Sequence, residues 1–531
     1  MKKTSYNKLL LLGATAFVAT ACTDKFEEYN TNTYQVTEEE MTWDNQKTGS
    51  FFAQMQRGVT LFKDGTNEYS DYQVEEGLTS DLYSGYVAAT IASRNGQHTG
   101  AYYFVQGWYD QTFTKRYTQV MAPFSQLTKV AEEQNRPEIK ALATVVKVMA
   151  MHRAADAYGA LPYCNYGSNS LTSTYDGLQA IYTQFFSELD EAIEELQTLA
   201  ASGASLMSNY DYVYGGDVSQ WVKLANTLRL RLAMRVVYAN AALAKTEAEK
   251  CVSSGIGFIE SKNDRAVVDE NHTSITYYHP LYEIAYNFND GDCRPGASII
   301  AYMNGYNDPR LSVYFKKADD SGEYVGVRSG VYTSTWADYR YGKVSNFNIT
   351  TASAITWFTA AESWFLRAEG ALRGWNMGGT AQEFYNKGIQ ASFEETGASG
   401  VDAYLADDTS TPGDYVDPVA SNNCANTSTI TIAYDESADF ETNLERIITQ
   451  KWIAIYPDGP EGWSEFRRTG YPKLFPVVNN ASSGTVDTDI QVRRIPFPVS
   501  EYNNDAEGVQ TGIAALGGAD NGGTKVWWDK K

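Results

Sequence analysis

Apolar residues recur at steps of three and four through much of the first half of the chain, the spacing of one face of an α-helix. Between residues 180 and 199 the stripe consists of Ile181, Phe185, Leu189, Ile193 and Leu196. Similar stripes predict helices over 137–158 and 217–243. Three arginines of the last segment lie off its stripe, where we expect them to be solvated or paired with acids. They are Arg229, Arg231 and Arg235.

Residues 356–397 have the pattern of two helices separated by a glycine-rich turn. Small and aromatic residues recur at Trp357, Ala361, Trp364, Ala368 and Ala371, and then at Ala381, Tyr385 and Gly388. This spacing is similar to a tetratricopeptide unit with one extra residue in the turn. Residues 256–355 and 398–438 lose the helical period and are predicted to be long insertions. We therefore predict a mainly α fold of tetratricopeptide-like helical hairpins with long irregular loop insertions and few short strands.

The start of the chain has the features of an exported lipoprotein. Three lysines precede the apolar stretch 9–19, which is too short to span a bilayer, and small residues lead to Cys22. We predict a signal peptide over 1–21. The stretch resembles a lipobox, whose cysteine is acylated after cleavage, although Ala19 stands where Leu is usual. The alternative is an ordinary signal peptide in which Cys22 is incidental. Residues 22–40 are then a lipidated tether and 41–531 a single domain.

Composition narrows the classes of partner. The 531 residues carry a net charge of −22, which excludes nucleic acid as an expected partner because phosphate backbones need a basic face. No later segment has eighteen unbroken apolar residues, so no transmembrane helix is predicted. The four cysteines after Cys22 are far apart, and the sequence leaves open whether they form disulfides or remain free thiols. They are Cys164, Cys251, Cys293 and Cys424.

Two segments near the end carry a resemblance to a known family. KWIAIYPDGPEGWSEFRRTGYP (451–472) and RRIPFPVSEYNND (493–505) are similar to the closing signatures of the SusD/RagB family of outer-membrane nutrient-binding lipoproteins, in particular its SusD-like branch. The opening CTDKFEEYNTN and the helix pair of 356–397 also resemble it. We interpret the signature residues as structural. Trp452 and Trp463 are expected in the core, and Arg467 and Arg468 are expected to pair with Glu461 or Glu465.

The resemblance implies a function. It implies a surface-exposed lipoprotein of the outer membrane that binds a nutrient and delivers it to a TonB-dependent, SusC-like transporter. The favoured ligand is an oligosaccharide, including host-derived amino sugars and sialic acid; a peptide, as for RagB-like carriers, is the alternative. Two other classes stay open: a glycosidase-type enzyme, which is disfavoured because no catalytic motif appears, and a protein-binding scaffold without its own ligand.

The ligand residues must be chosen without a motif. Sugar sites need flat aromatic side chains and a few planar hydrogen-bonding groups. The densest such stretch is 322–348, and 276–296 and 84–110 are the second and third choices. Packing in the core is the alternative for each single residue. The predicted ligand-binding residues are Tyr332, Trp336, Tyr339, Arg340, Arg328 and Asp338.

No catalytic residue, metal site or cofactor is predicted. The segment NFNDGDC (287–293) partly resembles a calcium loop, but it lacks the later Glu of a calcium hand, so a helix-capping turn is favoured. The four histidines are dispersed, and no thiolate pattern accompanies His272 and His279.

Overall fold

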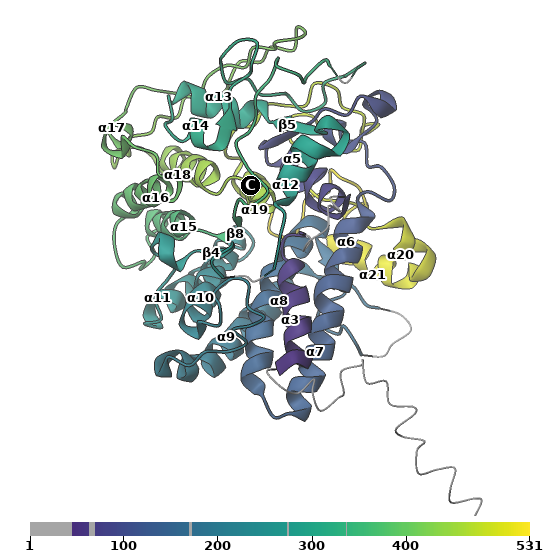
Figure 1. Cartoon of the computed structure of the whole chain (residues 1–531), viewed down its shortest axis with the longest axis vertical. Helices are drawn as coiled ribbons and strands as arrows, with labels where there is room; N and C mark the ends of the chain where they lie inside the picture. The colour runs from purple at the N-terminus through teal and green to yellow at the C-terminus, as the bar shows by residue number, and fades with distance from the viewer. Residues whose placement is uncertain (1–44, 63–69, 169–172, 273–274, 336) are drawn as a thin grey trace, which may run out of the picture. The chain divides into compact units, whose positions relative to one another are not determined.

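The helix-forming stripes of the first half build a set of neighbouring helices. In the computed structural model, which describes residues 45–62, 70–168, 173–272, 275–335 and 337–531, α8 spans Pro137–Tyr158. It begins and ends where the sequence predicts. α9 (Leu178–Ser202) packs against α8, and α7 (Ala122–Glu133) lies on its other side (Figure 1).

The predicted helix 217–243 is two helices. α10 (Val218–Arg235) begins at Asp217, whose side chain accepts hydrogen bonds from two backbone amides of the first turn. A short turn follows, and α11 (Ala241–Ser253) starts after Asn240, which caps it in the same way. The uninterrupted prediction was wrong because the capping side chain of Asn240 competes with continued helical bonding.

The predicted pair over 356–397 is present with a later start. α15 (Ala360–Leu372) and α16 (Ala381–Thr396) pack closely, and a Cβ on Gly388 would lie 2.8 Å from the ring of Phe365. Residues predicted as the first turn of this pair belong instead to strand β8 (Ile355–Phe358). The β-branched Ile355 and the aromatic residues after it suit a strand.

The remaining elements are short and confirm a mainly α fold with few strands. Antiparallel strand pairs are β1 (Val87–Ala89) with β5 (Cys293–Pro295), β2 (Ala160–Leu161) with β3 (Asp176–Gly177), β4 (Ala266–Val268) with β8, and β6 (Phe315–Lys316) with β7 (Asn346–Phe347). The other α-helices are α3 (Gln46–Arg57), α4 (Ser70–Tyr72), α5 (Ser80–Tyr83), α6 (Asp110–Arg116), α12 (Pro280–Tyr282), α13 (Ala297–Gly305), α14 (Leu311–Tyr314), α17 (Val401–Leu405), α18 (Phe440–Ala454), α19 (Gly459–Thr469), α20 (Val499–Asn504) and α21 (Ala506–Leu516).

The signature segment forms α18 and α19 in the core. Trp452 and Trp463 are 0% and 1% exposed, as predicted. Arg468 makes two bonds of 2.6 Å to Glu369 and one of 2.5 Å to Glu465. Arg467 differs from the prediction: it donates to backbone carbonyls and stacks 3.5 Å from the Trp463 ring.

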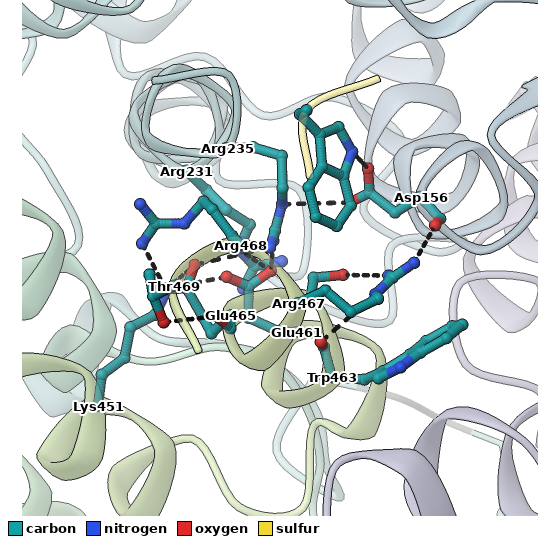
Figure 2. Close-up of polar contacts among 12 residues, drawn as sticks. Asp156, Arg231, Arg235, Lys451, Glu461, Trp463, Glu465, Arg467, Arg468 and Thr469 are labelled. Atoms are coloured by element: carbon teal, nitrogen blue, oxygen red, sulfur yellow. Dashed lines mark hydrogen bonds and ion pairs between the residues drawn. The ribbon is translucent and has the colours of Figure 1, made fainter. Parts of the chain in front are cut away.

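Charged side chains from four helices converge around this segment (Figure 2). Lys451 lies 2.8 Å from Glu461 and 3.3 Å from Glu465. Arg235 pairs with Glu461 and, at 3.3 Å, with Asp156. The arginines of α10 are thus paired with acids, and they are buried rather than solvated. Burying such pairs costs desolvation free energy that offsets much of their mutual attraction, whereas removing one partner leaves an uncompensated charge.

The N-terminal predictions fall outside the described residues. The signal peptide 1–21, the tether 22–40 and Cys22 all precede residue 45. Residues 1–47 and 48–531 are two separate units by contact, and the fold above is that of the second. Among the helices that the structure describes, none combines the length and apolar character needed to cross a membrane. The four later cysteines are free thiols.

Candidate functional site

The three segments that the sequence ranks as alternatives for the ligand site meet at one place. β1 pairs with β5, with Ala88 opposite Arg294, and the Thr90 amide extends this pairing by donating to the Asp292 carbonyl at 2.8 Å. A parallel bridge then joins Gly296 to Val327. The backbone therefore ties segments 84–110, 276–296 and 322–348 together. We call the place where they meet the loop junction.

A small hydrophobic cluster separate from the main core supports the loop junction. Its buried members are Ala88, Val327, Val331, Tyr339 and Val344. The Tyr339 hydroxyl donates to Asp417 at 2.9 Å and accepts from Asn422 at 3.1 Å. Tyr339, 2% exposed, thus packs beneath the loops and anchors them to the second insertion, 398–438.

Arg340 joins the three segments through hydrogen bonds. It is 1% exposed, and its guanidinium donates to the side chain and the carbonyl of Thr90 at 3.2 and 3.1 Å and to the Asn289 carbonyl at 2.5 Å. It also lies 3.5 Å from Asp292. Burial, together with the charge of Arg294, lowers the pKa of Arg340 to about 10, so it is still charged at neutral pH. This geometry makes Arg340 a staple between loops.

Two further residues predicted to bind ligand instead make hydrogen bonds with backbone atoms. Arg328, 9% exposed, donates to the carbonyls of Asn422 and Pro476 at 2.9 and 2.8 Å. Asp338 accepts from the amides of Ser334 and Thr335 at 2.8 and 3.0 Å, and these bonds lower its pKa. Trp336 lies outside the described residues.

Tyr332 presents its ring to solvent. It is 54% exposed, and its hydroxyl lies 3.5 Å from the side-chain oxygen of Asn95. Next to Asn95, the guanidinium of Arg94 lies over the Trp108 ring, 4.7 Å from its centroid. A flat ring, an amide and a guanidinium can bind a sugar without covalent chemistry: the ring takes C–H faces and the polar groups take hydroxyls. The sequence marked the segment of Arg94, Asn95 and Trp108 only as a third choice.

Left-handed backbone concentrates at the loop junction. Of the twelve non-glycine residues with positive φ in the described part of the chain, six lie in its segments. Such conformations cost free energy and gather at ligand-binding loops, where the surrounding structure enforces them. The six are Arg94, Asn95, Tyr102, Asn289, Asp290 and Tyr341.

Segment 287–293 forms part of the loop junction. It follows the π-helix Glu283–Asn287, whose C-cap is Phe288, as expected for a helix-capping turn, and then forms a 3-10 turn over Phe288–Asp290 that leads into β5. Asp292 accepts from Gln73 at 2.6 Å and faces Arg340, and Asp290 accepts from the Tyr341 hydroxyl at 3.1 Å. Within the described ranges no three His, Cys, Asp or Glu side chains are grouped as metal ligands would be.

Comparisons with known proteins cover almost the whole chain. The profile of the family described as SusD-like, Susd and RagB outer membrane lipoprotein, matches residues 28–529. A chitin-binding SusD homologue from Flavobacterium johnsoniae is 41% identical, with a TM-score of 0.85 over 91% of this chain and 99% of that one. No curated protein matches the chain.

Solved structures from two Bacteroides species agree with this family match. SusD homologues from Bacteroides uniformis and Bacteroides thetaiotaomicron are 39% and 35% identical, with TM-scores of 0.84 and 0.83. Each alignment covers 91% of this chain and 99% of the relative. Since both the profile and these relatives span nearly all of the sequence, the chain belongs to the SusD-like family, which is described as one of outer membrane lipoproteins.

Proposed function

We propose that this protein binds a glycan at the loop junction and passes it, without chemical change, to a TonB-dependent transporter of the outer membrane. The observation that carries the proposal is the exposed ring of Tyr332, whose hydroxyl lies 3.5 Å from Asn95 at the junction of the three segments. A chitin-binding relative at 41% identity supports a glycan ligand and makes N-acetylglucosamine oligomers the first to test.

The six predicted ligand residues take two roles in this proposal. Tyr332 contacts the sugar, and Trp336 remains a predicted contact from the sequence. The buried side chains position the loops. Tyr339 and Arg340 pack beneath the loop surface, and Arg328 donates hydrogen bonds to two backbone carbonyls. Asp338 holds the backbone amides of Ser334 and Thr335.

Titration of chitotetraose into residues 23–531 tests the site. Tyr332→Ala removes the exposed ring, and we expect it to weaken binding about three- to tenfold, the range for one aromatic contact. Tyr166→Ala is the matched control. Tyr166 lies on the loop after α8, is also exposed, at 38%, and packs against Tyr117. Equal affinity in the wild type and Tyr332→Ala would remove Tyr332 from the site. Release of shorter oligomers would show an enzyme instead.

The anchor and the partner are tested in cells. The proposal has Cys22 acylated and the protein on the outer face of the outer membrane. Cys22→Ala should abolish labelling by a palmitate analogue and shift the protein to the soluble fraction. Affinity purification of the wild type should recover a SusC-like barrel. Retention of Cys22→Ala in the membrane without label would contradict the lipid anchor.

A further inference from the structure

Arg94 differs from the other arginines of the protein. Its guanidinium is exposed and contacts the Trp108 ring. Among the described residues, no oxygen accepts a hydrogen bond from it. The other arginines in the described ranges bond to carboxylates, carbonyls or other partners, which is expected in a chain with 65 acidic and 43 basic residues. An unpaired guanidinium on such a chain therefore stands out.

The surroundings leave this charge available. The contact with Trp108 is made to the face of the ring, a cation–π contact that uses none of the guanidinium N–H donors for a hydrogen bond to an oxygen. Two acids of the loop junction are engaged elsewhere: Asp338 accepts from two backbone amides, and Asp290 accepts from Tyr341. Burial and, second, the charge of Arg94 lower the pKa of His98 to about 4, so His98 is neutral and Arg94 is the cation here.

The position of Arg94 connects it to the proposed sugar site. The side-chain oxygen of its neighbour Asn95 lies 3.5 Å from the Tyr332 hydroxyl, and both Arg94 and Asn95 are held in left-handed conformations, with φ of 75° and 50°. A planar fork of donors fits a carboxylate better than it fits single hydroxyls, because two parallel charge-assisted bonds form at once.

We infer that Arg94 and Trp108 form a subsite for the carboxylate of an acidic sugar, next to the ring of Tyr332. The inference rests on the proposed glycan-binding function and narrows its ligand to glycans that carry a carboxylate. At long range the net charge of −22 repels such a ligand, so its selection depends on contact with Arg94.

The test compares one glycan with and without its charge. Hyaluronan tetrasaccharide contains acetamido sugars and carboxylates, and its methyl ester has the same backbone without charge. We expect calorimetry to give about tenfold tighter binding for the acid than for the ester, the size of a hydrogen bond to a charged group. Arg94→Gln should remove this preference, because the acid then loses about ten times more affinity than the ester does.

Controls separate a direct contact between Arg94 and the carboxylate from a general effect of charge and from an effect on Trp108. Lys129→Gln removes one exposed positive charge on α7 and should keep the preference for the acid. If Arg94→Gln weakens acid and ester equally, Arg94 only orders Trp108 and the inference fails. Chitotetraose binding with no preference for the acid also overturns it, while the glycan-binding proposal stands. Failure of all three sugars to bind overturns both.

Discussion

Neutralising Asp81 should change how stability depends on pH. Asp81 lies on α5 and is 2% exposed. The Tyr72 hydroxyl donates to one carboxylate oxygen at 2.7 Å, whereas the other has no hydrogen-bond partner and lies against Gly459. Burial first, and the charge of Glu76 second, raise the pKa of Asp81 to about 8. The folded protein therefore holds a proton that the unfolded chain has lost at neutral pH.

The direction and size follow from linkage. Because the folded-state pKa is above the unfolded value of about 3.9, the group's contribution is full below about pH 4 and is lost as pH rises to about 8. Each pH unit inside this window costs about 1.4 kcal/mol of unfolding free energy. Between pH 5 and 7 Asp81 alone should thus remove up to about 2.7 kcal/mol. Asp81→Asn has no proton to gain and should lack this loss.

Urea unfolding at pH 5, 6 and 7, followed by tryptophan fluorescence, measures the effect. Comparing the slope with pH, rather than absolute stability, cancels any fixed cost of the new amide. Asp319→Asn, at an exposed position, controls for the charge change and should keep the wild-type slope. If Asp81→Asn also keeps that slope, Asp81 is ionised in the folded protein and the reasoning about its burial is wrong.

Two further substitutions test the roles of buried arginines. Arg340→Met should speed hydrogen exchange at Thr90 and weaken chitotetraose binding by about fivefold or more, since the staple between loops costs on the order of 1 kcal/mol per lost bond. Unchanged exchange at Thr90 would refute the staple. Arg468→Met leaves Glu369 short of two bonds and should cost about 3–5 kcal/mol in urea unfolding. A loss below about 1 kcal/mol, typical of surface pairs, would contradict the assigned burial.

Periodicity predicts the long helices and misses what side chains do at their ends. α8 matches its predicted bounds because both ends carry local signals, a proline in the first turn and Gly159 in the left-handed conformation after the last. The break between α10 and α11 depends on a capping bond from Asn240, which apolar spacing does not register. β8 depends on a partner strand about ninety residues earlier, and a local window contains no such partner.

The sequence selects a region for the proposed site, but within that region it does not separate exposed from buried residues. Composition singled out 322–348, yet it could not separate the exposed Tyr332 from the buried Tyr339 only seven residues later. Burial there is decided by Ala88 and Val344, which pack with Tyr339 in the small cluster. Arg340 likewise is buried because its acceptors, such as Thr90, come from another segment of the chain.

The three segments were ranked as competitors because sequence reasoning treats each segment by itself. Non-local pairing removes that choice: β1 with β5, and Gly296 with Val327, bring the segments together before any side chain is considered. The aromatic, amide and guanidinium groups of a sugar site can then come from different loops, each with too few of them to form a motif. A site assembled in this way leaves several segments of the sequence enriched in aromatic and polar residues. The correct expectation is that such segments meet in the folded protein, rather than that one of them forms the site alone.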